Sequence, residues 1–173
     1  MALLARFAAA AGKVLKNIYA YGTEYVSMMK GYDYVAYGGS NIYTEGAGSI
    51  TLTARYYGEF AEVATSTGVT VDLTDYKTLW VDWAAGNPNG GVGVYALVVH
   101  SSFGNSLETY TARYSAQLTG TSGTPVYLDR CTNSLDVSAL SGNHYISVHS
   151  RKSTGGWWDS MAVEVYRIWL SKL

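Results

Sequence analysis

Few side chains in this sequence belong to the types that bind metals or act as nucleophiles. It contains three histidines and one cysteine among 173 residues. His144 and His149 are five residues apart in a strand-like segment, and an odd spacing directs two side chains to opposite faces of a strand. They cannot share a metal ion without a bulge, so we interpret them and His100 as structural residues. Cys131 alone cannot form an intrachain disulfide and is interpreted as a small apolar strand residue. The sequence therefore predicts no metal site and no cofactor.

Carboxyl groups are the remaining groups that could catalyse a reaction. Hydrolysis of a polysaccharide requires two carboxyl groups that face each other across a cleft, and Asp82 and Glu164 on predicted strands are the formal candidates. Asp72, Asp75 and Asp136 are better explained as corner residues, whose short side chains bond to nearby backbone N–H groups. Nucleophile elbows, zinc-protease motifs, phosphate-binding loops and dinucleotide fingerprints are all missing from the sequence. We therefore expect a protein that is not an enzyme, with hydrolysis of cell-wall polysaccharide as the alternative.

Two adjacent tryptophans give the strongest indication of binding. Trp157 and Trp158 follow two glycines in a loop between two predicted strands. Aromatic rings exposed on such a loop can stack on sugar rings, whose C–H faces are apolar. In the alternative interpretation they close the end of the fold or contact a neighbouring subunit, because large aromatics also anchor subunit interfaces. The other members of this candidate carbohydrate-binding site are Tyr56, Tyr57, Asn87 and Asn89.

The elements that would position these residues are predicted to be β-strands. Residues 71–83 combine a polar corner with a strand in which Leu79, Val81 and Trp83 alternate with other residues, and residues 135–149 repeat this pattern. Short segments of this kind, separated by frequent turn signals and with no long helix between them, are typical of a sandwich or barrel. We predict an all-β fold: an antiparallel jelly-roll-type β-sandwich of eight to ten strands behind a short N-terminal helix.

The amino terminus differs in composition from the rest. Residues 1–19 are rich in Ala and Leu, which favour a helix. Isolated helices of this length are marginal in water, so we expect this one to dock on other copies of itself or in a groove of a larger assembly. A signal peptide is the alternative, but Arg6 lies inside the apolar stretch instead of ahead of it. The apolar seam has alternating spacings of three and four residues and consists of Leu4, Phe7, Ala11, Val14 and Ile18.

Composition limits the partners. The net charge of −1 gives no basic surface for nucleic acid, and no apolar run is long enough for a membrane span. The chain contains 16 Tyr and 5 Trp, and tyrosine-rich surfaces often bind ligands, although tyrosine also suits strands. We divide the chain into a docking or oligomerisation helix (1–19), a Tyr/Gly-rich connector (20–48) and a β-sandwich domain (49–173).

Five segments, residues 21–25, 71–83, 134–138, 144–151 and 165–170, resemble the small β-sandwich module of tail-associated minor structural proteins of phages and prophages of Gram-positive bacteria. The resemblance implies a virion component that forms a trimer, and it supplies no catalytic residues. We therefore expect a protein displayed on the phage particle as a tail fibre, tail tip or head decoration, with the N-terminal helix bound to other virion proteins. Two hypotheses follow: an adhesin for host cell-wall carbohydrate, or a purely structural decoration protein.

Overall fold

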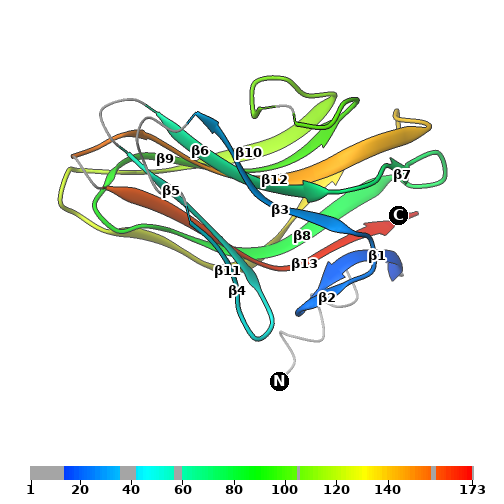
Figure 1. Ribbon diagram of the computed structural model, residues 1–173, viewed down its shortest axis with the longest axis horizontal. Helices are drawn as coiled ribbons and strands as arrows, with labels where there is room; N and C mark the ends of the chain where they lie inside the picture. Colours follow the sequence, from blue (N-terminus) through cyan, green and yellow to red (C-terminus); the bar gives the residue numbers. More distant parts are fainter. Residues whose placement is uncertain (1–13, 36–41, 57–59, 105, 157–158, 173) are drawn as a thin grey trace.

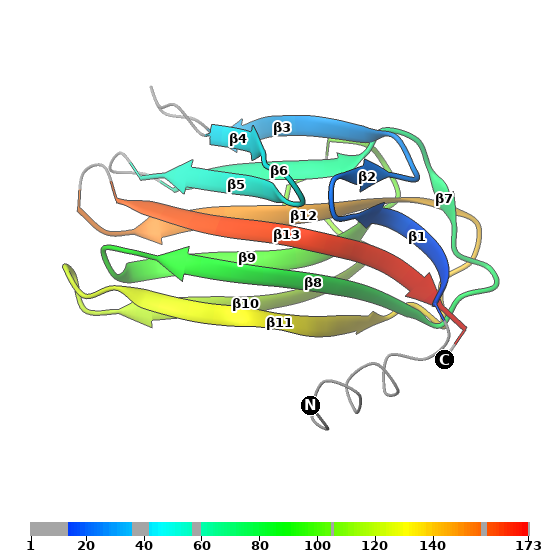
Figure 2. The ribbon, with the colours of Figure 1, turned by 90° about the horizontal axis from the view of Figure 1, so that it is seen from below.

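The computed structural model describes residues 14–35, 42–56, 60–104, 106–156 and 159–172. Within these residues, thirteen strands form two antiparallel sheets that pack face to face (Figures 1 and 2). The predicted antiparallel β-sandwich is confirmed, with more strands than the eight to ten expected. The described residues contain no helix, and hence none that could cross a membrane.

Sheet A is the layer that faces the viewer in Figure 2. Its strand order is β11-β8-β13-β1-β2, with β5 beside the first half of β13 and β4 beside β5. The strands of sheet A are β1 (Val14–Ala20), β2 (Thr23–Glu24), β4 (Ile42–Glu45), β5 (Ile50–Arg55), β8 (Thr78–Asn87), β11 (Val126–Asp136) and β13 (Ser160–Ser171).

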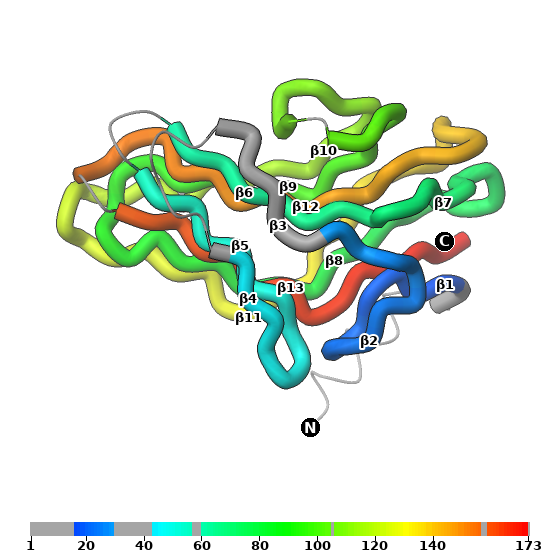
Figure 3. The backbone as a smooth tube through the Cα atoms, viewed as in Figure 1, coloured from blue at the N-terminus to red at the C-terminus, as the bar shows by residue number. Residues whose placement is uncertain are grey.

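Sheet B forms the other layer, in the order β10-β9-β12-β6-β3, and β7 pairs with the start of β12. The loop between β9 and β10, residues 101–111, lies over the outer face of this sheet (Figure 3). The strands of sheet B and β7 are β3 (Met28–Val35), β6 (Ala61–Thr67), β7 (Val71–Asp72), β9 (Gly91–His100), β10 (Ala112–Gly120) and β12 (Asn143–Thr154).

The core lies between the sheets and follows the alternation of the strands. In β8, the inward residues Leu79, Val81 and Trp83 are all fully buried, whereas the residues between them are half-buried. The indole ring of Trp83 meets the ring of Tyr95 edge-on at 5.0 Å between centroids, and its Nε1 donates to Asn133 Oδ1 at 2.8 Å. Because the indole N–H has a hydrogen-bond partner, the buried ring leaves no polar group unsatisfied in the core. The alternation in burial gives β8 one core face and one outer face.

Both predicted corners are confirmed. Asp72 Oδ1 accepts hydrogen bonds from Thr74 N (3.0 Å) and Thr74 Oγ1 (2.6 Å). In the second corner, Asp136 Oδ1 accepts from Ser138 N at 2.8 Å. Hydrogen bonds from the hydroxyl and the backbone N–H of Thr74 lower the pKa of Asp72, and those from the hydroxyl and backbone N–H of Ser138 lower the pKa of Asp136. As the residue types indicated, the acidic side chains serve to turn the chain at these positions.

The predicted N-terminal helix is wrong where the structure describes it. Val14–Ala20 is strand β1, which pairs antiparallel with the end of β13. Ile18 is fully buried in the core and cannot dock on a partner. Strand pairing satisfies the backbone groups along this part of β13, and with burial of Ile18 it outweighs the helix propensity of the segment. Of the other predicted docking residues, Leu4, Phe7 and Ala11 and the side chain of Val14 lie outside the described part of the chain.

Candidate functional site

A groove of about 440 Å³ runs along the outer face of sheet A. Its floor is made of small residues, Ala84 and Gly86 on β8 and Ala162 on β13. Taller side chains from the flanking strands form its sides, so the groove follows β8 between β11 and β13, on the face turned to the viewer in Figure 2. A volume of this size lies within the range of small-molecule sites. The side-forming residues include Thr51, Tyr127, Asp129, Arg130, Glu164 and Tyr166.

Tyr127 provides an exposed aromatic surface at one side of the groove. It pairs with Gly86 across the β8–β11 ladder, and Gly86 pairs with Ala162 on the other side. A methyl group on Gly86 would lie 3.1 Å from Cδ1 and 3.2 Å from Cε1 of the Tyr127 ring. Glycine therefore allows the ring to lie against the strand. Tyr127 is nevertheless 67% exposed, so most of the residue remains available to a ligand.

A β-bulge in β13 places Tyr166 in the groove. Val165 pairs with Trp83 and Arg167 pairs with Asp82, so Tyr166 is an extra residue without a counterpart on β8. On β13, Glu164 precedes the bulge and points to the outer face of sheet A. The extra residue, Tyr166, adds a second side chain to the same face. Bulges re-aim side chains in this way and are common beside functional sites.

A second bulge, in β11, places Arg130 at the same level of β8. Leu128 pairs with Ala85 and Cys131 pairs with Trp83, so three steps along β11 match two along β8. The added length presents Asp129 and Arg130 together on the outer side, where both line the groove. The two bulges thus bring Arg130 and Tyr166 together from strands on opposite sides of β8.

Arg130 is held by a carboxylate and two aromatic rings. Its Nε donates to Asp82 Oδ1 at 3.0 Å, and its Nη2 donates to Asp82 Oδ2 at 2.6 Å. The guanidinium carbon lies 4.0 Å from the ring centroid of Tyr166 and 5.5 Å from that of Tyr21. Nη2 also donates to the hydroxyl of Tyr21 at 3.2 Å. The hydrogen bonds to Asp82 raise the pKa of Arg130, and such two-pronged pairs are geometrically well defined.

The formal catalytic candidates, Asp82 and Glu164, therefore both lie near this groove. Asp82 serves as the partner of Arg130 through both of its oxygens. Glu164 accepts a hydrogen bond from Ser49 Oγ at 2.7 Å. Burial raises the pKa of the Tyr166 hydroxyl, and the adjacent Glu164 raises it further. The groove thus offers an aromatic face beside hydroxyl, carboxylate and guanidinium groups, which suits the recognition of a polyhydroxylated ring.

The sequence placed the candidate binding site elsewhere. Asn87 is fully buried: its amide nitrogen donates to Gly91 O (3.1 Å) and Leu118 O (2.8 Å), and its oxygen accepts from Lys152. It cannot reach a glycan in solution, and that part of the prediction is wrong. Asn89 is exposed in the β8–β9 turn. Tyr56 follows β5, and neither Tyr56 nor Asn89 lines the groove. Trp157, Trp158 and Tyr57 lie outside the described residues.

The sequence does contain a signal for the two bulges. In β13 the buried residues Val163 and Val165 are two apart, but the next buried pair, Ile168 and Leu170, begins three residues later. In β11, likewise, Leu128 and Cys131 are the inward positions on either side of the irregularity. A three-residue interval in a period-two pattern indicates an extra residue. Arg130 and Tyr166 could have been found in this way.

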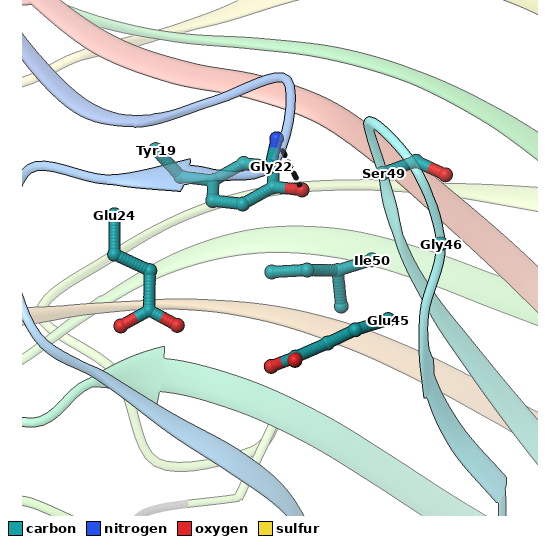
Figure 4. A pocket seen from close by; sticks show the side chains of 7 residues that line it. All are labelled: Tyr19, Gly22, Glu24, Glu45, Gly46, Ser49 and Ile50. Atoms are coloured by element: carbon teal, nitrogen blue, oxygen red, sulfur yellow. Dashed lines mark hydrogen bonds between the residues drawn. The ribbon is translucent and has the colours of Figure 1, made fainter.

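A smaller pocket lies near the start of β5, with Glu24 and Glu45 beside Tyr19 and Ile50 (Figure 4). Its volume of about 100 Å³ is below the range of typical ligand sites. Glu24 Oε2 accepts a hydrogen bond from Met28 N at 3.1 Å, and Glu45 Oε1 accepts one from the hydroxyl of Tyr43 at 3.1 Å. Both carboxylates thus have partners within the protein, and we favour the larger groove.

The remaining cluster of titratable groups is buried beneath the 101–111 loop. His149 Nδ1 contacts Glu62 Oε1 at 2.6 Å, and the Ser147 hydroxyl lies 2.7 Å from both His149 Nε2 and His100 Nε2. Loop residues complete the cluster, because Leu107 N donates to Glu62 Oε1 at 2.9 Å. These side chains are thus bonded to one another inside the protein, and the described residues contain no group of three His, Cys, Asp or Glu side chains that could hold a metal ion.

Comparison with known proteins gives matches among solved structures only. No protein-family model matches the chain, and no curated protein is sufficiently similar to it in sequence. TmCBM61 in complex with β-1,4-galactotriose has 16% identity and a TM-score of 0.44, with 84% of this chain and 87% of that chain covered. A family 29 carbohydrate-binding module has 12% identity and a TM-score of 0.48, with 91% of each chain covered.

A third match is the K1 cleaved adhesin domain of Lys-gingipain from Porphyromonas gingivalis. It has 16% identity and a TM-score of 0.48, and the match covers 72% of this chain and 75% of that chain. At these identities the likeness concerns the arrangement of the β-sandwich alone.

Proposed function

We propose that this chain is a non-catalytic carbohydrate-binding protein whose ligand lies in the groove on sheet A. The observation that carries the proposal is the exposed ring of Tyr127, which lies against Gly86 beside a row of polar groups. A sugar ring has an apolar C–H face and a rim of hydroxyl groups. The aromatic ring can receive the face, and the carboxylate, guanidinium and hydroxyl groups beside it can bond to the rim.

The proposed activity matches the adhesin hypothesis, with the contact surface moved from the Trp157–Trp158 loop to the groove. The location on a virion, the trimer and the docking to other virion proteins stay predictions from the sequence. The purely structural decoration protein is the second hypothesis, in which the groove binds no glycan. Hydrolysis of wall polysaccharide is disfavoured by the pairing of Asp82 with Arg130, because both carboxylate oxygens already accept hydrogen bonds from the guanidinium.

Replacement of the aromatic surface tests the proposal. We expect Tyr127→Ala to lower affinity for the bound glycan about tenfold, the loss expected when a stacked ring and its buried area are removed. Binding is measured by affinity electrophoresis against a panel of soluble polysaccharides, followed by calorimetry with oligosaccharides of the glycan that binds. Release of reducing sugar is measured in the same samples.

Tyr25→Ala is the matched control, because Tyr25 is 59% exposed and does not line the groove. It should bind like the unmodified protein, and both variants should unfold at nearly the same temperature, since exposed positions contribute little to stability. An unchanged affinity of Tyr127→Ala would exclude the groove as the site. Binding of no polysaccharide at all would favour the structural decoration protein, and released sugar would favour the enzyme.

A further inference from the structure

We infer that the groove accepts uncharged, hydroxyl-rich glycans and rejects anionic ones such as uronic acid or phosphate-bearing chains. This inference rests on the proposed function and names its ligand class. It is carried by the charges of the groove. Asp129 and Glu164 line it, and Asp82 is paired with Arg130. Of the described residues that line the groove, only Arg130 is cationic, so the two lining carboxylates and the Asp82 carboxylate together outnumber one guanidinium.

The single cation is already committed to a partner. Arg130 uses Nε and Nη2 for the two oxygens of Asp82, and Nη2 also donates to the Tyr21 hydroxyl. The ring of Tyr166 lies against the guanidinium, 4.0 Å from its carbon to the ring centroid. A ligand anion would have to compete with an intramolecular carboxylate in an established two-pronged geometry. The Asp82–Arg130 pair is close to neutral as a unit, and the charges of Asp129 and Glu164 remain.

An uncharged glycan suits the carboxylates that remain in the groove after Asp82 and Arg130 have paired. Ionised carboxylates only accept hydrogen bonds, and sugar hydroxyls can donate to them. A carboxylate or phosphate on the ligand brings further acceptors and a charge of the same sign. Charges of the same sign at an interface are unfavourable and suppress the wrong partner, particularly in a groove where the protein partly displaces solvent. The groove therefore selects by repulsion of anions as much as by attraction of hydroxyl groups.

The test uses one polysaccharide in three forms. The neutral polysaccharide that binds most tightly in the panel above is compared with its carboxymethylated and hydroxyethylated derivatives at the same degree of substitution. The hydroxyethyl form controls for added bulk. At low ionic strength we expect the hydroxyethyl form to bind within about threefold of the parent and the carboxymethyl form at least tenfold more weakly. Added salt should recover part of the loss, because it screens the repulsion between exposed charges.

Charge removal provides the second arm. The double variant Asp129→Asn/Glu164→Gln should reduce the difference between the carboxymethyl and hydroxyethyl forms several-fold. Asp75→Asn, which removes an exposed carboxylate outside the groove, should leave that difference unchanged. Equal or tighter binding of the carboxymethyl form would overturn this inference and leave the proposed function intact. The proposed function, and this inference with it, would instead be overturned if no neutral polysaccharide bound or if Tyr127→Ala bound as tightly as the unmodified protein.

Discussion

The buried amide of Asn87 joins three segments at one end of the sandwich. It donates to carbonyl groups at the start of β9 and in β10, and its oxygen accepts from the ammonium of Lys152 on β12. Lys152 is itself fully buried and donates also to Gly90 O. Burial lowers the pKa of Lys152, and the charge of Asp159 opposes this shift. The two acceptors compensate the ammonium for part of the hydration that it loses in the interior.

Removal of this amide should therefore destabilise the protein. We expect Asn87→Ala to lower the free energy of unfolding by about 3 kcal/mol, because it removes the donor to two carbonyls and one of the two acceptors of a buried ammonium. Urea denaturation followed by tryptophan fluorescence measures the change. Asn89→Ala, in the exposed turn nearby, should change the stability by less than about 0.5 kcal/mol. A loss below about 1 kcal/mol for Asn87→Ala would show that water replaces the amide at little cost.

At the scale of the strands, the groove depends on a single missing side chain in β8. Gly86 allows the Tyr127 ring to lie against the strand, and a methyl group there would approach two ring carbons to within 3.2 Å. We expect Gly86→Ala to displace the ring and lower glycan affinity several-fold, with Tyr127 still present. Stability should not fall, because glycine weakens the interior of a strand. Calorimetric titration with the bound oligosaccharide measures the affinity.

Gly48→Ala is the control for this substitution. Gly48 has nothing within 4 Å of the position of an added Cβ and lies outside the groove. Its alanine variant should bind and unfold like the unmodified protein. If Gly86→Ala retained full affinity, the orientation of the Tyr127 ring would have no role in binding, although the ring itself could still contribute.

The strands show how far local sequence determines this structure. The alternation of Leu79, Val81 and Trp83 predicted the core face of β8, because one buried face imposes a period of two. The two corners were predicted for a similar reason, since an Asp side chain bonds to a backbone N–H two residues away. These interactions are local. Local sequence patterns therefore predict the sandwich, its turns and much of its core.

The groove and strand β1 depend on contacts between distant segments. Arg130 and Asp82 are 48 residues apart, and their pairing depends on the bulge in β11 and its register with β8. The contact of Tyr166 with Arg130 requires, in addition, the bulge in β13. Ile18 lies in a segment with helix propensity, and pairing with β13 decides its conformation. A pattern within one segment cannot supply such registers. For that reason the sequence predicts a site in a loop with two tryptophans, whereas the candidate groove lies on the face of a sheet.

On the scale of the whole molecule, the two outer faces differ. The outer face of sheet A carries the open groove, whereas the 101–111 loop covers part of sheet B (Figure 3). Leu107 packs on Ala96 and Val98 beneath the loop. Polar bonds add to this contact: Thr109 O accepts from His100 Nδ1 at 2.6 Å, and Leu107 O accepts from Arg113 Nη1 at 3.0 Å. The stability of this cover should depend on protonation of the cluster below it.

Acid should weaken the cover through His100. Because Nδ1–H of His100 donates to the carbonyl of Thr109, the neutral ring presents Nε2 as the acceptor for the Ser147 hydroxyl. Burial, together with the adjacent His149, lowers the pKa of His100 to about 4 from its usual 6.5. Burial alone would raise the pKa of Glu62, but His149 and Arg151 lower it overall. The folded state thus binds fewer protons than the unfolded chain in mildly acidic solution.

Stability must therefore fall with pH in this range. A group with a lowered pKa contributes its stability fully above its unfolded value, and loses it as the pH falls through the folded value. For His100 this window extends from about pH 6.5 down to about pH 4, and the total loss is on the order of 3 kcal/mol. Glu62 acts in the same direction at the acidic end. We expect urea denaturation to give a clearly lower free energy of unfolding at pH 4.5 than at pH 7.

Two variants assign this loss. In His100→Gln, the amide can still donate to Thr109 O and accept from Ser147, but it does not titrate, so the decrease between pH 7 and pH 4.5 should shrink by about 2 kcal/mol. His144→Gln, which changes a histidine outside the cluster, should retain the full decrease. Hydrogen exchange at Leu107 N reports on the loop itself, and its protection factor, which corrects the exchange rate for the intrinsic pH dependence, should fall in acid. A decrease of equal size in both variants would show that His100 is not the group responsible for the acid sensitivity.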